Sequence, residues 1–311
     1  MKPGQCAFWM RNPHMSSLSE RPKNISIFPK PLKAKFPPLR KGASVNFTPQ
    51  QIQQYREQGY TTLPGFFDNR EVAAMQAELA RLQRDGLLRN VATEGDGKTK
   101  SQTAQNLQIC PLSPKSEFFR ALPFCPKVVA AVRECLGDPV QQQLDQIFLK
   151  PAGHGAGTSW HQDNAYFGIA DPTQGVGMWV AMHDATVANG TMQVIPGVYR
   201  EALKHTRDDG SDHHVRCYPH EEKAVPVEIR AGGALFFNYG VPHCTKANTT
   251  DKPRAGLALH FLRAGITTRP GQAPQGPILT GPNASDGTKE WGVKVAGTWE
   301  QQVTRLLANR E

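Results

Sequence analysis

The stretch from which both fold and chemistry can be predicted is WHQDNAYF, residues 160–167. It contains His161 and Asp163, which form the only His-x-Asp pair in the sequence. Successive side chains of a β-strand point to opposite faces, so residues i and i+2 point the same way. The spacing therefore predicts that both side chains meet one metal ion from the end of a strand.

A second histidine completes this ligand set. His243 lies 82 residues after His161 and just after a predicted strand at 234–238. Two histidines and a carboxylate on one face of a metal ion leave three positions open, and non-haem Fe(II) oxygenases use this arrangement. A lone His or Asp is more often structural, but these residue types in this order at strand ends favour a metal site.

Arg254 and Thr245 add a second kind of ligand-binding group. Arg254 lies eleven residues after His243, at the start of a predicted strand at 255–262, and Thr245 lies two residues after His243. A buried guanidinium beside a metal can hold the remote carboxylate of a dicarboxylate in two parallel, charge-assisted hydrogen bonds. A nearby hydroxyl could add a third.

The segments around these residues predict a mainly β protein. Capping signals and apolar spacing predict helices at 49–58, from Asp68 to near Gly86, at 126–136 and at 298–309. From residue 144 the pattern changes to short apolar or β-branched segments between Gly, Pro, Asn and Asp. These segments are 144–150, 176–182, 191–195, 225–229, 234–238 and 255–262. Early helices followed by many short strands predict a β-sandwich or jelly roll with helices packed outside it.

Charge is concentrated at the N-terminus. The chain of 311 residues carries +9, but residues 1–46 hold nine Lys and Arg and one Glu, which leaves +1 for the remainder. With seven prolines and no apolar periodicity, residues 1–46 are expected to be a flexible arm before a single domain at 47–311. A transit peptide, a partner-binding segment or a true start at Met15 stays open. The nearly neutral domain gives no reason to expect nucleic acid.

The cysteines and the hydropathy of the sequence indicate the cellular compartment. The six cysteines are scattered without a Cys-x-x-Cys pair, which favours reduced thiols in the cytoplasm. No stretch approaches 18 consecutive apolar residues and no secretory leader is recognisable, so no membrane span is expected. The oligomeric state is not predictable from these features.

A competing His-x-Glu motif lies at His220, inside the polar segment 207–223. That segment also holds His213 and His214, and we expect it to be a solvated loop. The glycine-rich run 153–157 opens no helix, so a dinucleotide site is not expected. We interpret it as a flexible approach to His161, with His154 exposed.

Several motifs together resemble the phytanoyl-CoA dioxygenase family. Residues 160–167 look like its proximal motif, and Pro242–Thr245 with Asn248, Thr250 and Arg254 look like its distal motif. Residues 179–182 and 189–197 resemble its central strands and Asn-Gly…Pro-Gly turn, and residues 48–66 its opening helix and first strand. The resemblance covers roughly residues 47–264. Val198-Tyr199 departs from the Ser-His common in the family, which we expect to reshape only a surface turn.

The resemblance implies a cupin-like double-stranded β-helix (a jelly roll) that uses Fe(II), 2-oxoglutarate and O2. It implies that His161, Asp163 and His243 ligate iron and that Arg254, assisted by Thr245, holds the distal carboxylate of 2-oxoglutarate. Lys150 and Gln162 are further candidates for orienting ligands and co-substrate. The implied reaction is hydroxylation of an aliphatic C–H bond, with succinate and CO2 as co-products.

The mixed charges of the segments expected near the pocket mouth favour a free small molecule over a CoA thioester. Two alternatives remain. One is a jelly-roll enzyme that uses the same three ligands with Zn(II) or Mn(II) for hydrolysis or isomerisation. The other is a non-catalytic binding protein.

Overall fold

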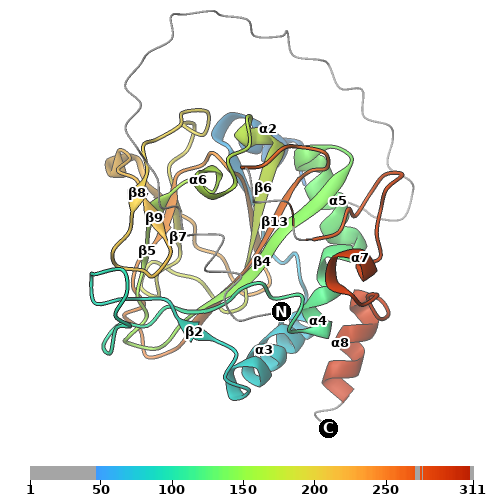
Figure 1. Cartoon of the computed structure of the whole chain (residues 1–311), viewed down its shortest axis with the longest axis horizontal. Coiled ribbons are helices and arrows are strands. Elements are labelled where there is room, and N and C mark those ends of the chain that lie inside the picture. Colours follow the sequence, from blue (N-terminus) through green and yellow to red (C-terminus); the bar gives the residue numbers. More distant parts are fainter. Residues whose placement is uncertain (1–46, 270–273, 275, 309–311) are drawn as a thin grey trace, which may run out of the picture.

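The computed structural model describes residues 47–269, 274 and 276–308 (Figure 1). The predicted N-terminal arm, residues 1–46, lies outside the described residues. Two antiparallel sheets form the body of the protein, and helices cover the larger one. This is the jelly-roll core with flanking helices that the sequence predicts.

The larger sheet, here called the major sheet, has seven strands. In spatial order they are β1 (Tyr60–Leu63), β11 (Ala234–Asn238), β6 (Gly175–Ala181), β13 (Arg254–Arg263), β4 (Val140–Lys150), β3 (Leu107–Ile109) and β2 (Arg89–Asn90). The minor sheet contains β10 (Val225–Pro226), β7 (Met192–Val194), β12 (His243–Thr245) and β5 (Thr158–His161). A separate pair joins β8 (Thr206–Arg207) to β9 (Val215–Arg216).

Four helices begin and end close to the predicted residues: α2 (Pro49–Gln58), α3 (Asn69–Arg84), α5 (Pro126–Leu136) and α8 (Trp299–Ala308). Three short helices of the described residues were not predicted: α4 (Glu117–Arg120), α6 (Asn164–Phe167) and α7 (Thr288–Trp291). Short 3-10 turns occupy Leu122–Phe124, Pro172–Gln174 and Glu221–Lys223. Thr48 and Asp68 each close a capping box with the residue three positions on, which fixes the starts of α2 and α3. Within the described part of the chain, no helix has the length and apolar character needed to cross a membrane.

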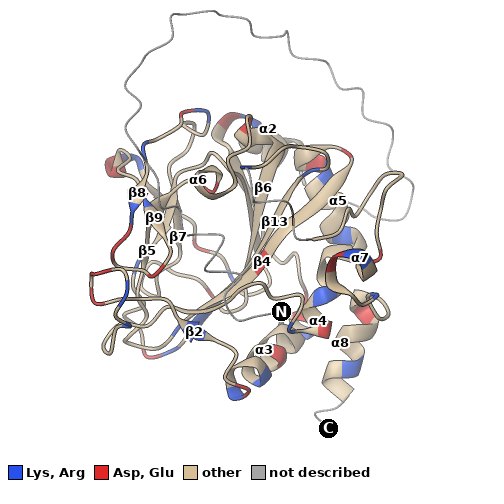
Figure 2. Cartoon of the chain, viewed as in Figure 1, with Lys and Arg blue, Asp and Glu red and all other residues tan. Residues whose placement is uncertain are grey.

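The core between helices and major sheet holds the sheet rigidly behind the pocket. Apolar side chains of α3, α5 and α8 pack against strands β4, β6, β11 and β13. Trp299 of α8 is 1% exposed and donates its indole N–H to Glu71 at 2.6 Å. Figure 2 shows cations and acids interspersed over the outer helices and loops, as the nearly neutral domain predicts.

Three local expectations were wrong. The strand expected at 225–229 shrinks to Val225–Pro226, because Pro226 has no N–H and sits in an edge strand. Tyr199 was expected in a surface turn, yet it is buried and donates its hydroxyl hydrogen to the carbonyl of Arg56 at 2.6 Å. Its ring packs against Gly59, whose φ of 84° ends α2. Tyr199, one of the two residues that differ from the family's Ser-His, therefore holds its loop against helix α2.

The segment 207–223 is likewise not a solvated loop throughout. His213 and His214 are 2% and 5% exposed, whereas His220 lies at the surface as expected. The reason is that β8 and β9 pair, and backbone hydrogen bonds from Thr93 and Gly97 dock the turn between them onto the 93–97 loop. His154 is exposed, as predicted.

Candidate metal centre and pocket

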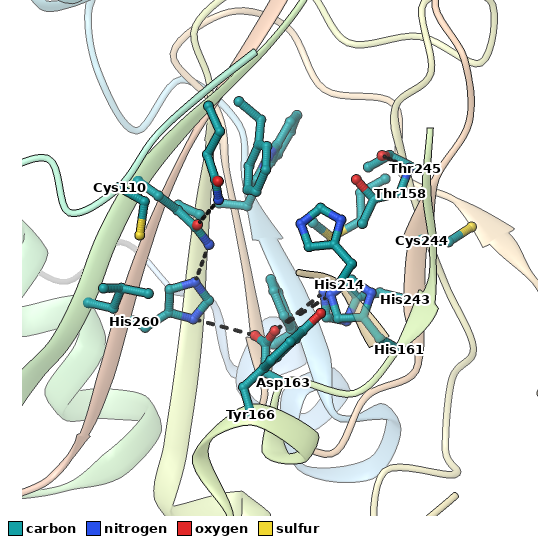
Figure 3. Close-up of a pocket in the computed structure, with 18 of the residues that line it drawn as sticks. Cys110, Thr158, His161, Asp163, Tyr166, His214, His243, Cys244, Thr245 and His260 are labelled. Atoms are coloured by element: carbon teal, nitrogen blue, oxygen red, sulfur yellow. Dashed lines mark hydrogen bonds and ion pairs between the residues drawn. The ribbon is translucent and has the colours of Figure 1, made fainter. Parts of the chain in front are cut away.

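Cross-strand pairing brings the two candidate histidines together. His161 ends β5, His243 begins β12, and the two residues are direct register partners in the minor sheet. Their ring centroids lie 4.2 Å apart. With Asp163 they form a buried group, here called the triad, whose ligand atoms all lie within 4.8 Å of one another (Figure 3).

Asp163 reaches the triad by a different route from the one predicted. The strand ends at His161, and Asp163 already has helical angles, φ −58° and ψ −31°, at the start of α6. The alternation of a strand therefore does not place it; a turn of the backbone does. Its Oδ1 lies 3.8 Å from Nε2 of His161 and 3.7 Å from Nε2 of His243.

The hydrogen bonds of the two rings leave lone pairs facing the carboxylate. Nδ1 of His161 lies 2.8 Å from the carbonyl of Ser159, and Nδ1 of His243 lies 2.9 Å from the carbonyl of Val241. A carbonyl only accepts, so both Nδ1 atoms carry the hydrogen and both Nε2 atoms are free to bind a cation. Burial, and then the neighbouring His243, lower the pKa of His161 to about 3.

The carboxylate completes a donor set that suits a divalent metal. Burial alone would raise the pKa of Asp163, but His260 and His243 hold it below its ordinary value, so the group is ionised. Two neutral imidazoles and one carboxylate match the three-ligand arrangement of non-haem iron sites. The same chemistry would also accept Zn(II) or Mn(II), so the donor set alone does not choose the metal.

Two buried cations lie at another part of the same pocket. Arg254 of β13 and Lys150 of β4 are cross-strand partners, each 1% exposed. Arg254 donates to the carbonyl of Gly190 and lies over the ring of Trp179 at 5.5 Å. Burial lowers the pKa of Arg254 to about 10; burial and then Arg254 lower that of Lys150 well below its usual value.

Neither cation has an acidic partner. None of the ion pairs between described residues includes Lys150 or Arg254. Lys150 instead donates to Thr245 Oγ1 at 2.8 Å and to the carbonyl of Lys246. Buried charges without a counter-ion are costly, so this arrangement favours an anionic ligand.

Gln162 does not line the pocket. Its side-chain amide donates to the carbonyls of Glu201 and Gly240, both at 2.6 Å, and accepts from the N–H of Leu203 at 3.0 Å. It therefore braces the loops beside the triad, while Lys150, Thr245 and Arg254 line the pocket itself.

The remaining wall of the pocket is aromatic and amide-rich. It includes Gln108, Gln143, Leu144, Gln146, Phe148, Tyr166, Phe167, His214 and His260. The carboxamide oxygen of Gln143 is buried and has no hydrogen-bond partner among the described residues. Burial, then His213 and His161, lower the pKa of His214 well below its ordinary value, so a neutral ring faces the cavity (Figure 3).

His260 is the residue near the triad that the sequence analysis missed. Its Nδ1 lies 3.4 Å from Oδ2 of Asp163, on the side away from the two histidines. The sequence did contain a sign of this position. Ala258 and His260 lie on the predicted strand 255–262, Arg254 directly precedes it, and the three are separated by even numbers of residues. Strand alternation places all three on one face, and all three line the pocket.

Comparisons with known proteins agree with this geometry. A family model described as phytanoyl-CoA dioxygenase matches residues 55–256. An ectoine dioxygenase of Bordetella parapertussis is 24% identical over 241 residues, 71% of this chain and 77% of that protein. Phytanoyl-CoA dioxygenase domain-containing protein 1 of Mus musculus is 26% identical over 270 residues, 71% of this chain and 91% of that protein.

Solved structures share the fold. The non-heme alpha ketoglutarate dependent carbocyclase SnoK from nogalamycin biosynthesis has a TM-score of 0.61 at 23% identity, covering 75% of this chain and 91% of its own. EctD from S. alaskensis, solved with 2-oxoglutarate and 5-hydroxyectoine, has a TM-score of 0.58 at 20% identity, covering 84% and 87%. Because the family match spans more than half of the 311 residues, the chain belongs to the phytanoyl-CoA dioxygenase family.

Proposed function

We propose that the protein hydroxylates an aliphatic C–H bond of a free, uncharged small molecule. Its family makes it an Fe(II)- and 2-oxoglutarate-dependent oxygenase, as the sequence predicts. The observation that carries the proposal is that one pocket joins a His-Asp-His triad to two buried cations without counter-ions. The triad suits the metal, and the cations suit a dicarboxylate.

Each part of the pocket then has a task. His161, Asp163 and His243 would hold Fe(II). Arg254, which is planar and donates from a rigid fork, would pair with the distal carboxylate of 2-oxoglutarate, and Thr245 and Lys150 would assist. When bound, Fe(II) and 2-oxoglutarate supply the oxidising chemistry: one atom of O2 goes into the substrate hydroxyl and the other into succinate, with loss of CO2.

The chain's own contribution to the reaction is binding and exclusion of water. The aromatic side chains Phe148, Tyr166 and Phe167 shape the cavity beside the triad. A shaped, dry cavity aims one C–H bond at the reacting position and prevents wasteful side reactions. The unpaired oxygen of Gln143 would accept a hydrogen bond from the substrate.

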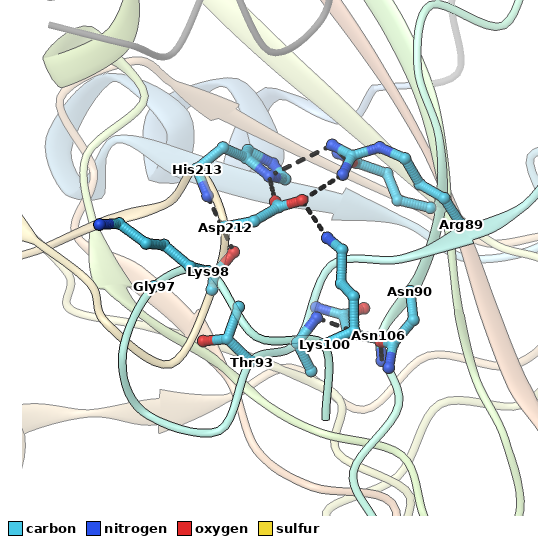
Figure 4. A network of polar contacts seen from close by, with 12 residues as sticks. Arg89, Asn90, Thr93, Gly97, Lys98, Lys100, Asn106, Asp212 and His213 are labelled. Atoms are coloured by element: carbon cyan, nitrogen blue, oxygen red, sulfur yellow. Dashed lines mark hydrogen bonds and ion pairs between the residues drawn. The ribbon is translucent and has the colours of Figure 1, made fainter. Parts of the chain in front are cut away.

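The chemistry of this wall supports a neutral substrate. Apart from the triad and the two cations, its polar groups are carboxamides, hydroxyls, two thiols, imidazoles and an indole, which bind neutral polar groups. Two nearby cations are engaged: Arg89 of β2 and Lys100 both pair with Asp212 (Figure 4). The phosphates of a CoA thioester would have to break these pairs, so we favour a free metabolite.

Each of the two alternative classes leaves one part of the pocket without a task. A Zn(II) or Mn(II) hydrolase would have no need of a dicarboxylate beside the metal. A non-catalytic binding protein would have no need of a complete triad.

The scattered cysteines continue to support a reducing compartment such as the cytoplasm.

The decisive experiment uses purified full-length protein loaded anaerobically with Fe(II), Zn(II) or Mn(II). Succinate formation is measured with 2-oxoglutarate and O2 across matched neutral metabolites, free acids and CoA esters. We expect succinate with Fe(II) alone, stimulated by neutral free molecules. Succinate formation without Fe(II), or stimulation by CoA esters alone, would contradict the proposal.

A further inference from the structure

A continuous series of side-chain contacts leads from the triad into the pocket wall. Oδ2 of Asp163 faces Nδ1 of His260 at 3.4 Å, and the dashed lines of Figure 3 continue from the other side of that ring. Nε2 of His260 lies 3.2 Å from the amide nitrogen of Gln146. The carboxamide oxygen of Gln146 accepts from the amide of Gln108 at 2.9 Å.

The series ends on an arginine at the edge of the major sheet. Arg89 of β2 donates to the carboxamide oxygen of Gln108 at 3.3 Å. The same guanidinium pairs with Asp212 and contacts His213 on the turn between β8 and β9 (Figure 4). We call the four residues the relay: His260, Gln146, Gln108 and Arg89.

The chemistry at this end sets the direction of every hydrogen bond. Arg89 can only donate, so Gln108 must present its oxygen to it and its nitrogen to Gln146. Gln146 in turn presents its nitrogen to His260. Nε2 of His260 must therefore accept, and the ring hydrogen resides on Nδ1, the nitrogen that lies 3.4 Å from Oδ2 of Asp163.

The elements that carry the relay are well fixed. His260 lies on β13, Gln146 on β4 and Gln108 on β3, which are neighbours in the major sheet. Gln146 is the register partner of Ala258, two residues before His260, and so faces the same side of the sheet. His260 and Gln108 are 4% and 1% exposed, so water does not compete for these bonds.

We propose that the relay makes His260 a positioning residue for the metal. Oδ2 of Asp163 and Nδ1 of His260 are buried, have no hydrogen-bond partner among the described residues and lie 3.4 Å apart, so their attraction would hold Asp163 with Oδ1 alone turned toward the two histidines. The carboxylate would then offer one oxygen to the metal instead of two. This inference rests on the proposed function, because it assigns the relay to the same metal site.

The test compares metal affinity in variants of the full-length protein. Fe(II) is titrated anaerobically against a competing chelator, with Co(II) as a redox-stable second probe. His260→Leu removes the N–H, and we expect affinity to fall about 10- to 100-fold, the usual effect of losing a partner behind a ligand. His260→Asn keeps an amide N–H near the Nδ1 position and should restore most of the affinity.

Two glutamine variants separate the relay from general packing. Gln146→Leu removes the donor that fixes the His260 ring, and we expect a several-fold loss of affinity. Gln143→Leu is the matched control, because Gln143 lines the same pocket but its oxygen bonds to no described residue. Its metal affinity should equal that of the unmodified protein. Thermal unfolding of each metal-free variant checks folding, and the glutamine pair decides the matter if His260→Leu does not fold.

Specific results would overturn the inference. Unchanged affinity in both His260→Leu and Gln146→Leu would do so, as would equal losses in Gln146→Leu and Gln143→Leu. An Asn variant as weak as the Leu variant would also do so. The proposed function fails separately, if the unmodified protein binds Fe(II) but never converts 2-oxoglutarate to succinate.

Discussion

Replacing Arg254 by Ala should weaken 2-oxoglutarate binding about a hundredfold or more. Arg254 is 1% exposed and has no acidic partner among the described residues, so a bound carboxylate would be its counter-ion. Removing one member of a buried charge pair costs about 2–5 kcal/mol. At about 1.4 kcal/mol per factor of ten, the middle of this range, about 3.5 kcal/mol, corresponds to a loss of roughly 300-fold. Thr245 and Lys150 remain to bind the carboxylate, which keeps the loss below the upper bound.

The assay is an anaerobic calorimetric titration of 2-oxoglutarate into the Fe(II)-loaded protein. Arg254→Lys keeps the charge but loses the planar fork and its contact with the Trp179 ring, so we expect a loss of about tenfold. Arg263→Ala is the matched control, because Arg263 lies on the same strand and is exposed. Wild-type affinity in Arg254→Ala, or an equal loss in Arg263→Ala, would refute the assignment of Arg254.

Further predictions concern the metal, pH, the N-terminus and the product. His161→Ala should abolish stoichiometric Fe(II) binding, measured by metal analysis, and substitution of the exposed His220 by Ala should leave binding intact. The reverse result would show that His161 is not the ligand. Because the pKa of His161 is lowered to about 3 in the folded state, only the unfolded chain takes its proton below about pH 6.5. The free energy of unfolding of the metal-free protein should therefore fall by about 2 kcal/mol between pH 6.5 and 5 because of this group. Denaturant titrations at several pH values should show that the free energy of unfolding of His161→Gln depends less steeply on pH. Removing residues 1–46 should leave a folded, active enzyme, because that segment lacks the apolar periodicity of a core-forming sequence, whereas Phe47 packs against Phe236 of the major sheet; an insoluble truncation would disprove this. Because Asp163 would fill the metal position that chloride needs for a halogenation, mass spectrometry should find a hydroxylated product and no chlorinated one.

Local signals in the sequence were sufficient for most of the fold. The boundaries of α2 and α3 were predictable because Thr48 and Asp68 begin capping boxes, whose contacts span only three residues. The triad was predictable from residue type and order. The route by which Asp163 joins it was not, because the turn after His161 depends on a bond from the N–H of Asn164 to the distant carbonyl of Tyr239.

Long-range contacts explain what the sequence did not reveal. Burial of His213 and His214 depends on docking between segments more than 100 residues apart, and polar composition gives no sign of it. The contact of His260 with Asp163 joins strand β13 to the start of helix α6 across the pocket. Alternation along one strand can place His260 on the correct face, but it cannot identify the partner opposite.

The triad also has a mechanical consequence. His161 and His243 belong to the minor sheet, while His260, which contacts Asp163, belongs to the major sheet. An ion held by all three ligands would join β5, β12 and the start of α6, and the contact of Asp163 with His260 would couple this group to the major sheet. At one hundred times the dissociation constant this adds about 2.7 kcal/mol to folding stability, a large fraction of what most domains possess. In a cell short of iron, such an enzyme would lose more than turnover: its folded lifetime would shorten, and its abundance would follow the iron supply.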